Sequence, residues 1–182
     1  MKRILAPLLI FALLFAPSCS KAAKQPPPPD DLAVNEAYHA ALTAYIWFDA
    51  DSMPCDTSVS QEVDGKRFSL VTYPSIQTLA ELKAHLECYF SEEIVTELLS
   101  RDLYRDIDGK LYGVAATRGT NPLKGDEAYE VIRESDTKII YRVKVANLDP
   151  NDPTVVTGYT YVDMNYESVG GKWVFTAFDM VR

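Results

Sequence analysis

The sequence predicts an α+β fold in which N-terminal helices pack on a curved antiparallel sheet. Apolar residues keep helical spacing only in the part of the chain before Arg101. Asp108-Gly109 lies between two alternating runs, and this dipeptide favours a tight hairpin because both turn positions need a positive φ. Beyond residue 126, predicted strands follow one another through short turns, so they are expected to be antiparallel neighbours. The expected appearance is cystatin-like or nuclear-transport-factor-like.

The chain begins with the pattern of an export signal. Lys2 and Arg3 precede an apolar run over residues 4–15, which is short for a membrane span and typical of a signal peptide. Small residues then end in Cys19, as in the lipobox of bacterial lipoproteins. We therefore expect residues 1–18 to be removed and Cys19 to carry lipid, palmitate included. An ordinary cleaved signal with an incidental cysteine is the alternative.

Residues 19–31 are expected to form a tether between the lipidated cysteine and the domain. Four consecutive prolines, Pro26 to Pro29, favour an extended polyproline II segment. Two or more acyl chains anchor a protein stably, whereas one chain is marginal. The predicted location is the cell envelope, with the domain anchored to the outer face of a bacterial membrane.

The remaining residues, 32–182, suit a single α+β domain. Removal of Lys2 and Arg3 leaves 16 basic and 26 acidic residues, a net charge of −10. This balance argues against binding to nucleic acid or to an anionic membrane surface, and it allows basic protein partners.

Three helices are predicted in the first half of the domain. The first follows Asp30 or Asp31 as cap and carries an apolar stripe from Val34 to Phe48. Residues 49–65 are expected to be a polar loop. A second helix begins at the capping-box pattern of Thr78 to Glu81, and a third begins after Ser91, where acidic residues suit the helix dipole.

The strands are predicted from alternation and from turn residues. Gly170-Gly171 marks the last turn. The expected strands cover residues 67–73, 103–107, 110–114, 128–133, 138–148, 155–166 and 172–178.

Several short segments resemble, in order and spacing, a known family. They are Ala44-Tyr45, Trp47-Phe48, Leu79 to Lys83, Tyr89 to Ser91, Asp106 to Tyr112, Arg118-Gly119 and Gly170 to Phe175. The chain is similar here to the IseA-type inhibitors of bacterial D,L-endopeptidases, the cysteine peptidases that cut peptidoglycan stem peptides. The resemblance implies a small exported protein that is not an enzyme, needs no cofactor and blocks a cell-wall peptidase through loops. The lipid anchor and the Cys55/Cys88 pair depart from the family.

The expected partner contacts lie on two polar turns. They are Asp108 and Gly109 in the hairpin, and Arg118, Gly119, Thr120 and Asn121 in the following loop.

Cys55 and Cys88 are the only thiols left if Cys19 is acylated, and exported chains enter an oxidising or thiol-poor setting. We expect them to form a disulfide that stabilises the domain by ~3–4 kcal/mol. The alternative is a Cys88 nucleophile with His85 as base, which the acidic neighbours Glu81 and Glu87 disfavour because a thiolate needs an electropositive pocket.

Other candidate sites have a structural interpretation that we favour. Asp106 and Asp108 hint at a calcium loop, but Ala115 stands where the final glutamate ligand belongs, so a hairpin turn is preferred and no metal is expected. His39 is interpreted as a boundary residue of the first helix. An acidic cluster favours a solvated strand edge, and four tyrosines favour core or cross-strand packing over a ligand cage. The cluster is Asp126, Glu127, Glu130, Glu134 and Asp136, and the tyrosines are Tyr104, Tyr112, Tyr159 and Tyr161.

Two functions follow as hypotheses. The first is a lipid-anchored binding protein that inhibits a cell-wall D,L-endopeptidase. The second is a cone-shaped domain that binds a small molecule or performs acid–base chemistry, with Asp163 or Asp179 pointing inward.

Overall fold

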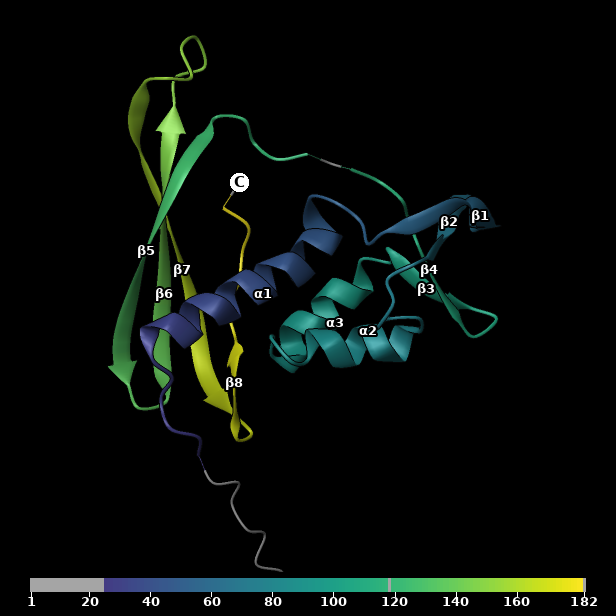
Figure 1. The fold of residues 1–182 in the computed structure, drawn as a ribbon, viewed down its shortest axis with the longest axis horizontal. Coiled ribbons are helices and arrows are strands. Elements are labelled where there is room, and N and C mark those ends of the chain that lie inside the picture. The colour runs from purple at the N-terminus through teal and green to yellow at the C-terminus, as the bar shows by residue number, and fades with distance from the viewer. Residues whose placement is uncertain (1–24, 118, 182) are drawn as a thin grey trace, which may run out of the picture.

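The computed structural model describes residues 25–117 and 119–181, and it confirms the α+β class. Two four-stranded antiparallel sheets flank three helices, and a connection over residues 114–123 joins the sheets (Figure 1). The predicted signal peptide and Cys19 lie outside the described residues. Among the described residues, no helix has the length and apolar character needed to cross a bilayer.

The first helix, α1 (Asp31–Asp49), begins as predicted. The carboxylate of its N-cap, Asp30, accepts a hydrogen bond of 2.8 Å from the backbone N–H of Ala33. Its buried face carries the predicted apolar stripe, and it crosses in front of the large sheet (Figure 1). The buried residues are Val34, Tyr38, Ala41, Ala44, Tyr45, Trp47 and Phe48.

The small sheet has the strand order β1-β2-β4-β3. Its first strand corrects the prediction, because the expected loop over residues 49–65 contains β1. Asp64-Gly65, with φ of 53° and 74°, forms the tight turn into β2, and the same chemistry at Asp108 and Gly109 joins β3 to β4 as predicted. The bounds are β1 (Cys55–Val63), β2 (Lys66–Val71), β3 (Tyr104–Ile107) and β4 (Lys110–Gly113).

Two short helices separate β2 from β3. Helix α2 (Leu79–Leu86) has the predicted capping box, in which Thr78 and Glu81 exchange side-chain and backbone hydrogen bonds. Helix α3 (Glu92–Ser100) follows Ser91 as predicted, although Ser91 makes no side-chain capping bond. Their buried faces contribute leucines and Val95 to the core.

The large sheet has the strand order β5-β6-β7-β8; β6 has the predicted bounds, and β5 and β7 are longer than predicted. The expected final strand over residues 172–178 ends at Phe175, because the chain then turns inward and Phe178 packs on Tyr45 and Phe90. The bounds are β5 (Lys124–Ser135), β6 (Lys138–Leu148), β7 (Val156–Val169) and β8 (Lys172–Phe175).

One hydrophobic cluster joins both sheets to the helices. It includes Val71 and Leu111 of the small sheet together with Ile139 and Met164 of the large sheet. Phe90 also forms a parallel bridge to Phe175, so the chain after α2 extends the large sheet past β8. The single curved sheet of the prediction is thus divided in two, while the core remains continuous.

Candidate functional site

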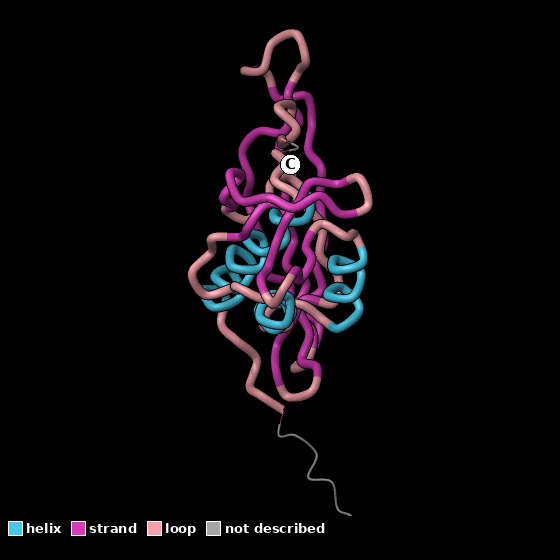
Figure 2. Tube along the Cα trace, turned by 90° about the vertical axis from the view of Figure 1, so that its right-hand side faces the viewer, coloured by secondary structure: helices cyan, strands magenta, loops and turns pink. Residues whose placement is uncertain are grey.

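The most exposed part of the fold is the end of the β6–β7 hairpin, which projects beyond the rest of the large sheet (Figures 1 and 2). We call residues 147–161 the β6–β7 arm. Every residue from Pro150 to Thr157 is exposed. The arm is therefore available to a partner along its whole tip.

Hydrogen bonds within the tip fix its conformation. Asp149 N–H donates to the carbonyl of Val155, and Val155 N–H donates to the carbonyl of Asp152, both at 2.9 Å. The Asp152 carboxylate accepts from the N–H and the hydroxyl of Thr154, and these bonds lower the pKa of Asp152. Pro150 and Pro153 restrict the chain further. The tip is a short loop with a defined shape.

Polar contacts at the base of the arm attach it to β5. Lys124 Nζ donates to Asn147 Oδ1 and to Thr160 Oγ1, both at 2.8 Å, and the Thr160 hydroxyl donates to Asn147 at 2.9 Å. Gly125 lies so close to Leu148 that a Cβ at this position would be 2.9 Å from a leucine methyl. These contacts hold the arm to the sheet.

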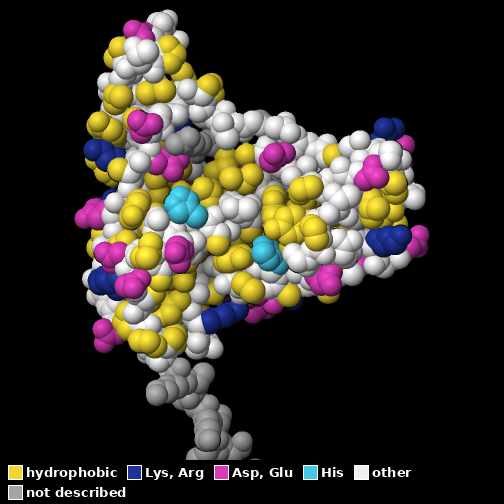
Figure 3. Space-filling view, viewed as in Figure 1, with side chains coloured by type: hydrophobic (Ala, Val, Ile, Leu, Met, Phe, Trp, Pro, Cys, Tyr) yellow, Lys and Arg dark blue, Asp and Glu magenta, His cyan; other side chains and the backbone are white. Residues whose placement is uncertain are grey.

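Exposed apolar side chains follow the arm and the strands beside it, and Figure 3 shows hydrophobic atoms along this part of the surface. Tyr159 and Tyr161 lie on one face of β7 because residues two apart share a face. Lys144 Nζ lies 3.8 Å from the centre of the Tyr159 ring, a cation–π contact. The exposed set, with exposed fractions of 37–59%, is Leu123, Tyr129, Val155, Val156, Tyr159 and Tyr161.

Core or cross-strand packing was predicted for four tyrosines, and two of them lie in the core. Tyr104 and Tyr112 are buried, and the Tyr104 hydroxyl donates to the carbonyl of Trp47 and accepts from the N–H of Met53, both at 2.9 Å. Tyr159 and Tyr161 are instead exposed. Nothing in the local sequence separates the two pairs, because burial depends on what covers each sheet face.

The opposite face of β5 has a tyrosine stack beside α1. Tyr38 stacks on Tyr141 at 4.5 Å, and Tyr141 stacks on the exposed Tyr129 at 5.4 Å between ring centres. Burial raises the pKa of Tyr141, whose hydroxyl donates to the side chain of Asn35. With His39 and Glu127, the rings line an open hollow of about 200 Å³. His39 is exposed beside the α1 stripe, as expected of a boundary residue.

The residues proposed for acid–base chemistry do not point inward. Arg142 donates two hydrogen bonds, of 2.6 and 2.7 Å, to the Asp163 carboxylate on the outer face of the sheet. These bonds lower the pKa of Asp163. Asp179 lies beyond the end of β8 and is exposed, so it does not share a strand face with Trp173. The cone-shaped interpretation loses its two candidate carboxylates.

The predicted partner loops lie in different parts of the molecule. Asp108 and Gly109 form the far tip of the β3–β4 hairpin, whereas residues 119–121 belong to the connection between the sheets (Figure 1). Gly119 N–H donates to Ala50, Thr120 lines a small hollow with Leu42 and Val181, and the Asn121 side chain accepts from Leu123 N–H. Arg118 lies outside the described residues. The fold does not bring these two turns together.

The expected disulfide is not formed in the structure. Cys55 is half-buried at the start of β1, its thiol directed to the carbonyl of Met53, and burial raises its pKa. Cys88 is exposed just after α2, with its thiol directed to the carbonyl of Ala84. The prediction placed Cys55 in a loop free to reach Cys88, but that loop is a paired strand. His85 stacks on Trp47 at 5.4 Å, and burial lowers its pKa.

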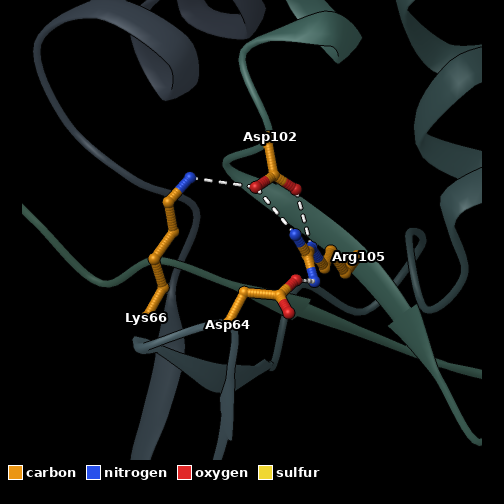
Figure 4. A network of polar contacts seen from close by, with 4 residues as sticks. All are labelled: Asp64, Lys66, Asp102 and Arg105. Atoms are coloured by element: carbon orange, nitrogen blue, oxygen red, sulfur yellow. Dashed lines mark hydrogen bonds and ion pairs between the residues drawn. The ribbon is translucent and has the colours of Figure 1, made fainter.

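Four charged residues beside the β1–β2 turn and the start of β3 bind one another. Arg105 makes a fork to Asp102, at 2.6 and 2.9 Å, and also reaches Asp64 at 2.7 Å, while Lys66 lies 2.9 Å from Asp102 (Figure 4). The two cations hold the pKa of Asp102 far below its usual range. This arrangement is that of a structural ion network.

In the hairpin considered as a calcium loop, a carboxylate is used in a turn hydrogen bond. The Asp106 carboxylate accepts from the N–H of Gly109 at 2.9 Å. Within residues 25–117 and 119–181, no three His, Cys, Asp or Glu side chains gather as a metal would require.

Comparison with protein-family models and with curated proteins finds no match to this chain. The resemblance to the D,L-endopeptidase inhibitors stays a prediction. The β6–β7 arm was not identified from the sequence as a site, although Asp149-Pro-Asn-Asp-Pro-Thr followed by two valines is a turn with an apolar flank. Its projection from the sheet is visible only in three dimensions.

Proposed function

We propose that this protein is a lipid-anchored extracytoplasmic binding protein that inhibits a cell-wall D,L-endopeptidase. It acts by binding its partner through the β6–β7 arm and not by catalysis. The choice of partner rests on the sequence resemblance, and the choice of surface rests on the structure of the arm.

The single observation that carries the proposal is the ordered, exposed tip. Binding a flexible loop costs about 0.5–1.5 kcal/mol for each side chain that must be immobilised, so a loop already fixed by hydrogen bonds binds more tightly. Asp149, Asp152 and two prolines supply that order, while Val155 and the tyrosines behind it supply apolar contact. Exposed tyrosine is enriched at protein interfaces because its ring is large and rigid.

The position of the N-terminal segment supports an anchored geometry. Trp173 Nε1 donates to the carbonyl of Pro27, and the side chain of Gln25 donates to the carbonyl of Asp136. The first contact is at the start of β8 and the second at the β5–β6 turn, and both lie at the opposite end of the large sheet from the arm (Figure 2). Eleven residues of strand span roughly 35 Å, so an anchor at one end holds the arm away from the membrane.

The net charge supports a basic partner. A protein of charge −10 after signal removal attracts a basic target electrostatically and raises its association rate at low salt. Inhibition is therefore expected to weaken as salt concentration rises, because screening shortens the reach of these charges.

The test compares Val155, which immediately precedes β7, with Val169, which ends it. The full-length protein, purified in detergent, is titrated into a D,L-endopeptidase digesting purified peptidoglycan. Val155→Lys, at the arm tip, is expected to weaken inhibition at least about tenfold. Val169→Lys is the matched control, because Val155, just before β7, is 46% exposed, and Val169, the last residue of β7, is 45% exposed.

Asp108→Lys probes the alternative contact surface predicted from the sequence. A larger loss from Asp108→Lys or from Val169→Lys than from Val155→Lys contradicts the arm as the contact. Absence of both binding and inhibition across several such endopeptidases rejects the proposed partner.

A further inference from the structure

Strand β5 is a long sheet edge with a regular register. Seven consecutive residues, from Glu127 to Arg133, pair with β6 without interruption. Among the described residues, β5 has no strand on its other side. An edge strand directs half of its backbone N–H and C=O groups away from the sheet, so this edge offers a template for another extended chain.

Three surface hollows lie along this edge, on both faces of the sheet, and Ala128 lines all three. One is on the α1 side, beside Tyr38 and Tyr129, and holds about 200 Å³. The other two are on the outer face, beside Tyr161 and Tyr159, and hold about 110 and 280 Å³. An added strand would place successive side chains alternately on these two faces, where the hollows lie.

The charges beside the open edge of β5 indicate what kind of chain would bind there. Glu127 and Glu130 lie in the regular stretch, and Asp126 precedes it at a register shift. Of the cations nearby, Arg133 binds Asp31, Arg142 binds Asp163, and Lys144, which lines both outer hollows, lies over the ring of Tyr159. A second copy of this acidic strand would be repelled, whereas a basic chain would be attracted.

We propose that β5 binds an extended basic peptide segment of a partner protein as an added strand, through residues 126–132. Backbone hydrogen bonds to the edge supply affinity, and the hollows on the two faces supply selectivity. The tether contacts at Arg133 and Asp136 mark the end of the available edge.

The hollow beside α1 suits a lysine or arginine side chain. Tyr129 and Tyr141 present stacked rings there, and Glu127 and His39 also line the hollow. A cation over an aromatic face gains about 0.5–1 kcal/mol at exposed sites, and more when water is excluded. This hollow does not include the arm, whereas the two outer hollows share Val156, Tyr159 and Tyr161 with it. The peptide is therefore tested by direct binding, which does not depend on inhibition of a peptidase.

The test uses a synthetic peptide about seven residues long that alternates lysine with valine and has blocked ends. Two comparison peptides carry glutamate for lysine, or N-methyl groups on every second backbone nitrogen along one edge. Binding to the full-length protein in detergent is measured by fluorescence anisotropy and by amide hydrogen exchange. The lysine peptide is expected to bind, to slow exchange within residues 126–132, and to lose affinity at least about tenfold on either change.

Ala128→Arg, which fills space common to the three hollows and adds positive charge, is expected to weaken binding. Val59→Arg on β1, the edge of the small sheet, is the matched control. Four results overturn the proposal: no binding by the lysine peptide, equal binding by the N-methylated peptide, slowed exchange at another element, or dimerisation through β5. The N-methylated peptide tests the proposal without any protein variant, so misfolding of Ala128→Arg does not obscure the answer.

Discussion

The two sheets have the same number of strands and the same antiparallel pairing, yet their surfaces differ in character. At the small sheet, Asp64, Lys66 and Arg105 form an ion network with Asp102, and the edge strand β1 loses its register between Asp56 and Ser60. In the large sheet, tyrosines are exposed and the edge strand β5 is regular over seven residues. Broken edges and paired charges discourage association, whereas open edges and exposed aromatic rings permit it.

This difference indicates a division of roles within one fold. The small sheet and the two short helices complete the hydrophobic core, while the large sheet carries the surfaces proposed for binding. Function therefore depends on which sheet face is left uncovered rather than on the fold class. Substitutions in each sheet test this division. The largest loss of stability is expected in the core that the two sheets share.

Phe175→Ala is expected to destabilise both sheets together. The side chain is fully buried against Tyr166 and Phe178, and its backbone bonds to Tyr89 and Ser91 of the helical region. Loss of a buried phenylalanine costs about 3–5 kcal/mol of the free energy of unfolding. Urea unfolding followed by circular dichroism and by tryptophan fluorescence should give one shared transition. Two separate transitions would show that the sheets are independent units.

The same substitution at one tyrosine of each sheet is expected to give losses of stability of intermediate size. Tyr104→Phe removes a buried hydroxyl that bonds Trp47 and Met53, leaving both backbone groups unpaired, and is expected to cost about 1–3 kcal/mol. Tyr161→Phe makes the same change at a side chain that is 59% exposed and should alter stability by less than about 0.5 kcal/mol. Thermal unfolding of both variants measures the difference. Equal losses would remove the structural distinction between the two sheets.

Much of the fold was predictable because its signals are local. The capping residues Asp30 and Thr78 mark helix starts, and Asp108-Gly109 marks a hairpin, each through bonds or dihedral angles of neighbouring residues. Strand β1 was missed because both of its faces are largely exposed and it has little apolar alternation. Its structure depends on pairing with β2, which a local pattern does not encode, although Asp64-Gly65 carries the same hairpin signal.

The candidate site was less predictable because it depends on exposure. Tyr159 and Tyr104 stand in similar alternating segments, but α1 covers only the second. The loops around Asp108 and Gly119 were grouped by sequence resemblance, and the fold separates them. A projecting arm and an open edge are properties of arrangement, so they emerge only after the sheets are assembled.

The smallest expected effect concerns acid, and it compares one carboxylate from each sheet. Asp102 contacts Arg105 and Lys66, whereas Asp163 contacts Arg142 alone, and these cations lower the pKa of both carboxylates. A carboxylate whose folded-state pKa is depressed stabilises the protein above its unfolded pKa of about 3.9. That contribution is lost as pH falls through the folded-state pKa. The free energy of unfolding should therefore decline below about pH 4.

Two substitutions assign this acid sensitivity to a sheet. Asp102→Asn removes the charge but suits the backbone, because Asp102 has a φ of 53° and asparagine tolerates that region. Its unfolding free energy is expected to fall less between about pH 6 and about pH 2 than that of the unmodified protein, and less than that of Asp163→Asn. Exposed ion pairs contribute little singly, so urea titrations at several pH values are required. If the unfolding free energies of the three proteins change in parallel with pH, the network around Asp102 does not stabilise the small sheet. The contrast drawn between the charges of the two sheets would then fail.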